Sequence, residues 1–152
     1  MKTDGNLIVQ ITGILGIVGS LIFVGFEMQQ SQRIAMAAQQ QARATITTDL
    51  MNSFTASGVD YHSIYWQDNL HYELSKAAIV RRNTVHSGWF IYENDFNQYS
   101  QGLVDEATWA AKLRAMEHMY NKCSVRMIYD ARKATFAEDF RNVIDAFPNQ
   151  CE

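Results

Sequence analysis

The stretch LIVQITGILGIVGSLIFVGFEMQQSQRIAMAAQQQARA, residues 7–44, joins an apolar half to a polar half, and nothing between the two halves resembles a helix stop. Residues 7–26 carry no charged side chain, and Glu27 is the first charge that follows them. A helix of this length rises about 30 Å, which is enough to cross the hydrocarbon core of a bilayer. The stretch therefore predicts a single membrane span that ends at Glu27.

A cleaved signal peptide is the alternative interpretation of this segment, because Ala35-Met36-Ala37 resembles a cleavage site. The apolar run is longer than the apolar core of a signal peptide, about 7–15 residues, and the candidate site lies well beyond the end of the run. The preceding region offers only Lys2 as a basic side chain. We therefore expect the segment to be retained as an anchor.

The polar half and its continuation, residues 27–58, predict a long helix outside the membrane. Neither proline nor glycine occurs from Glu27 to Ser57, and the segment is rich in the strong helix formers Ala, Gln, Met and Arg. An apolar stripe recurs at every fourth position, at Ala38, Ala42, Ile46, Leu50 and Phe54. Gly58 can supply the left-handed cap that ends the helix. We expect the span and this helix to form one continuous rod.

Small residues cluster on the predicted span. Thr12, Gly16 and Ser20 follow one another at a spacing of four, which places them on one helix face, and Gly13 and Gly19 lie beside them. Small side chains let a second helix approach closely inside a bilayer. We call these five residues the small-residue seam, and they predict packing against other integral membrane subunits within the lipid bilayer.

The remaining segment, residues 59–152, is expected to form a small helical bundle. It contains one proline, Pro148, and apolar residues from Val85 to Leu103 alternate spacings of four and three, as on one face of a helix. The predicted fold class is thus all-α: a transmembrane anchor (1–26), a juxtamembrane helix (27–58) and a helical soluble domain.

Cap residues predict where the helices of this domain begin and end. Gly102 should close the helix that starts before Val85, and Asp105 should cap the next one. Ser124 is expected to cap a short helix, and Thr135 is expected to open the last helix through a capping box with Glu138. A further short helix is expected over residues 61–72.

Three segments resemble a group of small bacterial proteins with one N-terminal span and a helical C-terminal domain. These segments are GFEMQQSQRIA, YENDFNQYSQGLVDEATW and TFAEDFRNVIDAF. The shared positions are Glu93, Phe96, Tyr99, Gly102, Trp109, Phe136 and Phe140. The resemblance implies a bacterial source and this architecture, and it implies no activity.

Few residues offer catalytic or ligand-binding chemistry. The sequence contains no glycine-rich phosphate loop and no CxxC, HExxH or GxSxG motif. Glu93 and His86 lie two turns apart on one helix face and are the candidate polar core. We expect Glu93 to hydrogen-bond at a helix junction, as buried polar groups must. No metal, cofactor or catalytic set is expected.

Four aromatic residues precede the main apolar stripe: Tyr61, Tyr65, Trp66 and Tyr72. A helical core accounts for most aromatic side chains of the domain. These four are candidates for a partly exposed interaction surface, because Tyr and Trp combine an apolar body with a polar tip.

The charges and cysteines of the sequence limit which partners and which cellular compartment are expected. The net charge is -3 and no block of like charges occurs, so nucleic acid is not an expected partner. Arg33 and Arg43 follow the span, whereas Lys2 precedes it, which favours a cytoplasmic C-terminal domain at a bacterial inner membrane. In that compartment Cys123 and Cys151 should be free thiols, although their spacing leaves open whether they lie close together.

These features together predict a non-catalytic accessory or structural subunit of a larger membrane protein complex. The alternative is a membrane-tethered enzyme or ligand sensor that uses the region around Glu93 and His86.

Overall fold

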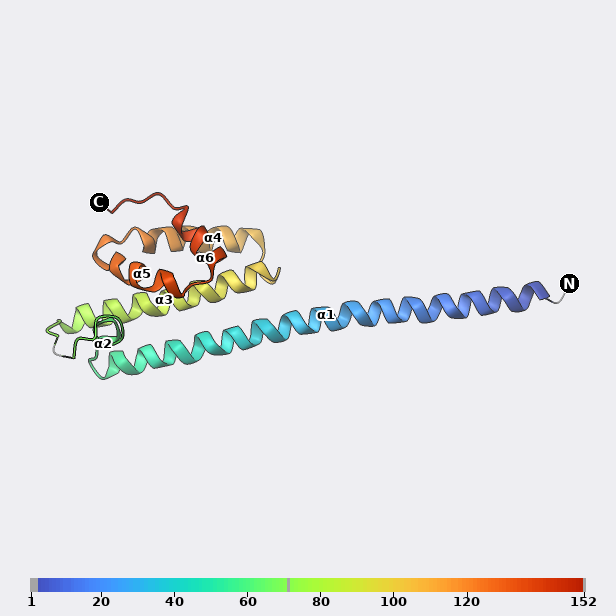
Figure 1. Ribbon diagram of the computed structural model, residues 1–152, viewed down its shortest axis with the longest axis horizontal. Helices are drawn as coiled ribbons and strands as arrows, with labels where there is room; N and C mark the ends of the chain where they lie inside the picture. The colour runs from blue at the N-terminus through green and yellow to red at the C-terminus, as the bar shows by residue number, and fades with distance from the viewer. Residues whose placement is uncertain (1–2, 71, 152) are drawn as a thin grey trace. The chain divides into compact units, whose positions relative to one another are not determined.

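The computed structural model describes residues 3–70 and 72–151, and every regular element among them is a helix. Figure 1 shows the helices in chain order from blue to red. They are α1 (Thr3–Ala56), α2 (Tyr61–Tyr65), α3 (Lys76–Ser100), α4 (Glu106–Tyr120), the 3-10 turn η1 (Cys123–Val125), α5 (Arg126–Arg132), the 3-10 turn η2 (Lys133–Thr135) and α6 (Glu138–Asp145). The all-helical fold class is confirmed. Lys2, which was compared with Arg33 and Arg43 to predict the orientation of the span, lies outside the described residues.

The helix α1 runs without interruption from Thr3 to Ala56, as the absence of stops after Glu27 predicted. The chain divides into two compact units, residues 1–38 and 39–152, so that the last part of α1 belongs to the second unit. The domain boundaries predicted at residues 26 and 58 remain predictions.

Within the first unit, α1 is long and apolar enough to cross a membrane by length and composition. None of its most apolar 18-residue window is buried against other protein. Phe23, for example, is 62% exposed. This description fits a membrane span and equally a signal sequence.

Two glycines end helices in the predicted way. Gly58 and Gly102 have φ values of 70° and 72°, in the left-handed region that favours glycine. The N–H of Val59 donates to the Phe54 carbonyl at 2.9 Å, and the N–H of Leu103 donates to the Gln98 carbonyl at 3.0 Å. These bonds are the outer bonds of Schellman motifs, which satisfy the last carbonyls of α1 and α3.

The core of the second unit forms where α3 packs on α4 and α5, and where α4 packs on α6. Its buried residues are Val85, Trp89, Trp109, Met116, Tyr120, Val125, Ile128, Tyr129, Phe136, Phe140 and Ile144. Aromatic contacts dominate: the Tyr99 and Trp109 rings stack with centroids 4.4 Å apart, and Trp89 lies 5.2 Å from Tyr129. The apolar stripe of α3 thus faces the core, as its spacing predicted.

The last part of α1 carries a buried side chain, Met51, and is tied to α3 by hydrogen bonds. Met51 is 1% exposed. The Gln41 side-chain oxygen accepts hydrogen bonds from Asn94 at 2.8 Å and from Gln98 at 3.0 Å. The segment 39–56 is therefore a structural part of the domain.

Of the three N-cap predictions, one is confirmed and two are wrong. Asp105 caps α4, since its carboxylate accepts from the Thr108 N–H at 2.9 Å. Ser124 lies inside η1 and caps nothing, and α6 begins after Ala137 with no side-chain cap. Thr135 ends η2 because the next residue, Phe136, adopts an extended backbone that places its ring in the core.

Replacing Gln40 by proline should lower the free energy of unfolding by about 3 kcal/mol, because it removes a helical hydrogen bond and clashes with the preceding turn. Thermal unfolding followed by circular dichroism measures this, with Gln40→Ala as the control. Equal stability of the two variants would contradict a continuous helix at this position.

Candidate functional site

The small-residue seam lies on an exposed stretch of α1. Its members Thr12, Gly13, Gly16, Gly19 and Ser20 are all exposed, and a methyl group at any of the three glycines would meet no atom of the described chain within 4 Å apart from adjacent residues and the local helix backbone. The Thr12 and Ser20 hydroxyls donate to backbone carbonyls of the same helix at 2.9 and 2.8 Å. The seam therefore presents a neutral surface without unsatisfied hydroxyl groups.

The four candidate interaction aromatics occupy different environments. Tyr65 is 66% exposed, Trp66 and Tyr72 are half-buried, and Tyr61 is buried. The Tyr61 ring packs on Phe54 and stacks on Tyr65, with centroids 5.1 Å apart in the stacked pair. Tyr72 accepts a hydrogen bond from the Asp60 N–H through its hydroxyl group. Only Tyr65 is thus broadly available to a partner, and the other three contribute to the fold.

The expected short helix over residues 61–72 ends at Tyr65, and a buried polar cluster holds it against α3. We call Asp60, His62, Arg82, Asn83 and His86 the corner cluster. Asp60 is fully buried, accepts from the Ser63 N–H at 2.7 Å and pairs with Arg82 at 3.1 Å. It therefore serves both as the N-cap of α2 and as an ion-pair partner of α3.

Asn83 joins three consecutive parts of the chain. Its side-chain oxygen accepts from the Tyr61 N–H at 3.0 Å. Its amide donates to the Val59 carbonyl at 2.9 Å and to the Thr55 hydroxyl at 3.0 Å. One amide thus fixes the end of α1, the following turn and the start of α2.

The two histidines of the corner cluster face each other. The distance from His62 Nδ1 to His86 Nε2 is 3.2 Å, so that one ring nitrogen donates and the other accepts. Burial is the main cause that lowers the pKa of both imidazoles. The cations Arg132 and Arg82 add to this effect at His86, whose pKa falls to about 2 in all, and Arg82 adds to it at His62. The Asp60 carboxylate raises the pKa of His62 and so offsets part of this lowering. Both rings are therefore neutral at pH 7.

Both members of the candidate polar pair, Glu93 and His86, lie in the electrostatic field of Arg132, a residue that the sequence did not single out. Arg132 is 2% exposed, and its guanidinium lies 3.7 Å from the Phe90 ring centroid. Its charge lowers the pKa of His86 and partly offsets the rise in the Glu93 pKa that burial causes. Arg132 forms no ion pair among the described residues, and its own pKa is lowered to about 10, first of all by burial.

This arrangement suits structural stabilisation better than catalysis. His62 and His86 are 3% and 0% exposed, so a substrate could reach their nitrogens only if α2 moved away. Among the described residues, no group of three or more His, Cys, Asp or Glu side chains lies close enough to hold a metal ion. The corner cluster acts instead as a set of directional contacts between α1, α2 and α3.

Lowering the pH from 7.5 to 5 should lower the free energy of unfolding by about 2 kcal/mol through His86 alone. Its folded-state pKa lies below the unfolded value of about 6.5, so the unfolded chain takes up protons first. The contribution is complete above pH ~6.5 and is lost at about 1.4 kcal/mol per unit below it. Urea unfolding at the two pH values measures the loss.

The variant His86→Gln should have a shallower dependence on pH than the parent protein, whereas His118→Gln, at an exposed site, should leave it unchanged. A parent protein whose stability is the same at pH 7.5 and 5 would contradict the neutral histidine pair.

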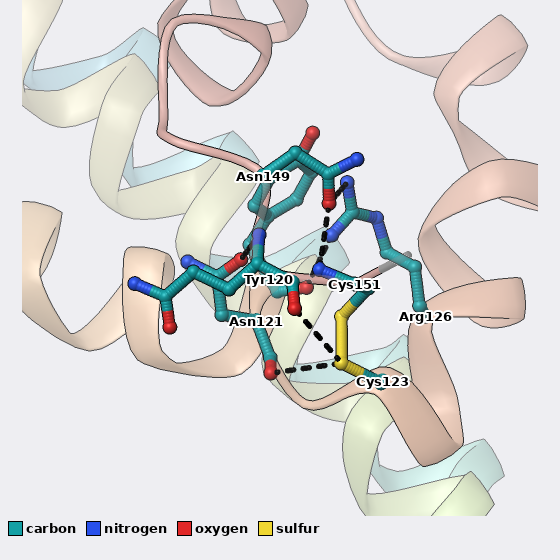
Figure 2. Close-up of a disulfide and its surroundings, with 7 residues drawn as sticks. Tyr120, Asn121, Cys123, Arg126, Asn149 and Cys151 are labelled. Carbon is teal, nitrogen blue, oxygen red and sulfur yellow. Dashed lines mark hydrogen bonds between the residues drawn. A yellow bond between two sulfur atoms is a disulfide. The ribbon is translucent and has the colours of Figure 1, made fainter.

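A disulfide joins Cys123, at the start of η1, to Cys151 in the C-terminal tail (Figure 2). The expectation of free thiols is therefore wrong: α6 returns the chain so that the two Cα atoms lie 5.2 Å apart, within the normal range for a bridge. The fold-back itself depends on tertiary packing of α6 on α4, which the cysteine spacing could not reveal.

Hydrogen bonds hold the tail beside the disulfide. Arg126 donates to the Tyr120 carbonyl at 2.7 Å and to the Asn149 side-chain oxygen at 3.3 Å, while its guanidinium covers the Tyr120 ring. The Gln150 N–H donates to the Asn121 side-chain oxygen at 3.0 Å. Figure 2 shows these side chains gathered around the two sulfur atoms. The bridge thus reinforces contacts that already position the tail.

Comparisons of the chain with protein-family models, with curated proteins and with solved structures gave no match in any of the three.

Proposed function

We propose that this chain is a single-span membrane protein that acts as a non-catalytic accessory subunit of a larger membrane protein complex. The observation that carries the proposal is the exposure of the apolar side chains of residues 7–26, which no part of the described chain covers. Lipid and the helices of other subunits are the surroundings that suit such a surface.

Retention of the apolar segment is part of this proposal. The run from Leu7 to Phe26 exceeds the apolar core of a signal peptide, and the candidate cleavage site, Ala35-Met36-Ala37, lies inside α1 rather than in a loop. Because α1 also supplies Met51 to the domain interior, an anchor at its start would connect directly to the folded domain.

The disulfide changes the proposed orientation. Disulfides persist in oxidising compartments and are rare in a reducing cytosol. We therefore place the C-terminal domain on the outer side of a bacterial inner membrane, the reverse of the orientation that the arginine count favours. Arg33 and Arg43 are both exposed and would then contact lipid headgroups or a partner subunit.

Association through the small-residue seam is tested by Gly16→Ile combined with Ser20→Ile. Bulky side chains should force the helices apart and lower the recovery of partner subunits about tenfold, equivalent to about 1.4 kcal/mol. Pull-down of the full-length protein from mild detergent, with quantitative mass spectrometry, measures this recovery.

The matched control is Gly25→Ile. Gly25 follows Gly16 by nine residues, which at about 100° per residue places it on the opposite helix face. This variant should insert in the membrane and retain its partners. Equal recovery with the seam and control variants would overturn the proposed mode of association.

A membrane-tethered enzyme or ligand sensor is the second candidate, and one observation favours it. Glu93 is only half-buried and lies within the electrostatic reach of Arg132, which has no ion-pair partner in the part of the chain that the structure describes. Native mass spectrometry of the detergent extract separates the two proposals. A lone monomer with a bound ligand supports the second candidate, and co-purification with other subunits supports the first.

A further inference from the structure

A groove of about 420 Å³ lies between the N-terminal part of α3 and the segment formed by the end of η1 and the start of α5. This volume falls in the range of small-molecule pockets, about 300–1,000 Å³. Its apolar wall comes from Leu74, Ala77, Ala78, Val125 and Met127. The groove lies within residues 39–152 and does not involve the apolar segment of α1.

Two arginines give the groove a positive rim, and no Asp or Glu lines it. Arg82 is paired with the buried Asp60, which compensates its charge. Arg81 is exposed and forms no ion pair among the described residues. The groove therefore combines an apolar wall with one uncompensated positive charge.

We propose that this groove binds a single-chain amphiphile with a carboxylate head, such as a free fatty acid. The small side chains of Ala77 and Ala78 leave room for the chain along α3, and Val125 and Met127 add to the apolar lining. The Arg81 guanidinium pairs with the carboxylate. This inference does not depend on the proposed role as an accessory subunit.

The probe is dodecanoic acid carrying a photoreactive diazirine, added to the full-length protein in lipid nanodiscs. Mass spectrometry of the cross-linked peptides should locate the label at residues 74–82 or 124–127. Unlabelled dodecanoate should compete, and dodecanol, with the same chain and no charge, should compete at least threefold less well.

Two variants test the two halves of the groove. Ala77→Phe places a ring in the groove from an exposed helix position and should lower labelling about tenfold. Arg81→Gln should lower it about threefold, the effect of one partly exposed ion pair. The matched controls on α4 are Ala115→Phe and Arg114→Gln, both at exposed positions, and they should label like the parent protein.

Loss of labelling in Ala77→Phe and Arg81→Gln, with unchanged controls, supports the site. Label found only in residues 7–26 would show partition into the surrounding lipid and overturn the proposal. Equal competition by dodecanol, or unchanged labelling of Arg81→Gln, would contradict the claim that the groove recognises a carboxylate head group.

Discussion

Reduction of the Cys123–Cys151 disulfide is expected to lower the free energy of unfolding by about 3.5 kcal/mol. The two cysteines are separated by 28 residues, and closing a loop of that length removes conformational entropy from the unfolded chain. Cys123 is exposed, so a reductant can reach the bridge. Urea unfolding of the full-length protein in detergent, with and without reductant, measures the difference.

The variant with both Cys123→Ser and Cys151→Ser is the control for this experiment. It should match the reduced parent protein and should not respond to reductant. The contacts of Arg126 with Asn149 and Tyr120 do not involve the sulfur atoms, so we expect the tail to stay near its present position after reduction. A change in stability below about 1 kcal/mol would contradict a structural role for the bridge.

Replacing Arg82 by methionine is expected to cost about 3–5 kcal/mol, because it leaves the fully buried Asp60 carboxylate without its ion-pair partner. The matched control is Arg81→Met, one residue earlier on α3 and exposed, which should change stability by less than about 0.5 kcal/mol. Urea unfolding at pH 7.5 separates the two variants.

Adding Asp60→Asn to Arg82→Met should restore a large part of the loss. The amide removes the buried charge, and its oxygen can still accept the Ser63 N–H that caps α2. If Arg82→Met and Arg81→Met were equally stable, the Asp60–Arg82 pair would contribute little to the corner cluster.

The elements that the sequence predicted well are those whose signals are local. The stop-free run through Glu27 predicted α1, and the alternating apolar spacing after Val85 predicted α3. Asp105 and Gly102 marked true helix ends because each acts on backbone groups only a few residues away. Such signals need no knowledge of the remaining fold.

The capping box at Thr135 failed because burial of Phe136 decided the local backbone. The pattern offers a favourable start to a helix at Thr135, worth about 1 kcal/mol. Burying an aromatic ring contributes more than that, and Phe136 is 6% exposed with an extended backbone. A single sequence does not reveal this competition.

Most of the corner cluster could not be predicted for a similar reason. Asp60 and His62 meet Arg82 and His86 across more than 20 residues, after a turn whose path no local motif specifies. The sequence singled out His86 through its helix face but gave no sign of its partner. Arg132 also belonged to no motif. It is nevertheless the cation with the largest electrostatic effect on the pKa values of His86 and Glu93.

Thiol labelling in intact cells tests most directly the proposal of a retained anchor with its domain in an oxidising compartment. Membranes washed with alkaline carbonate should retain the protein. Cys123 and Cys151 should react with a membrane-impermeant maleimide in unbroken cells only after an impermeant reductant has opened the bridge. Recovery of the protein in the soluble fraction, or labelling without reductant and only after lysis, would contradict the account.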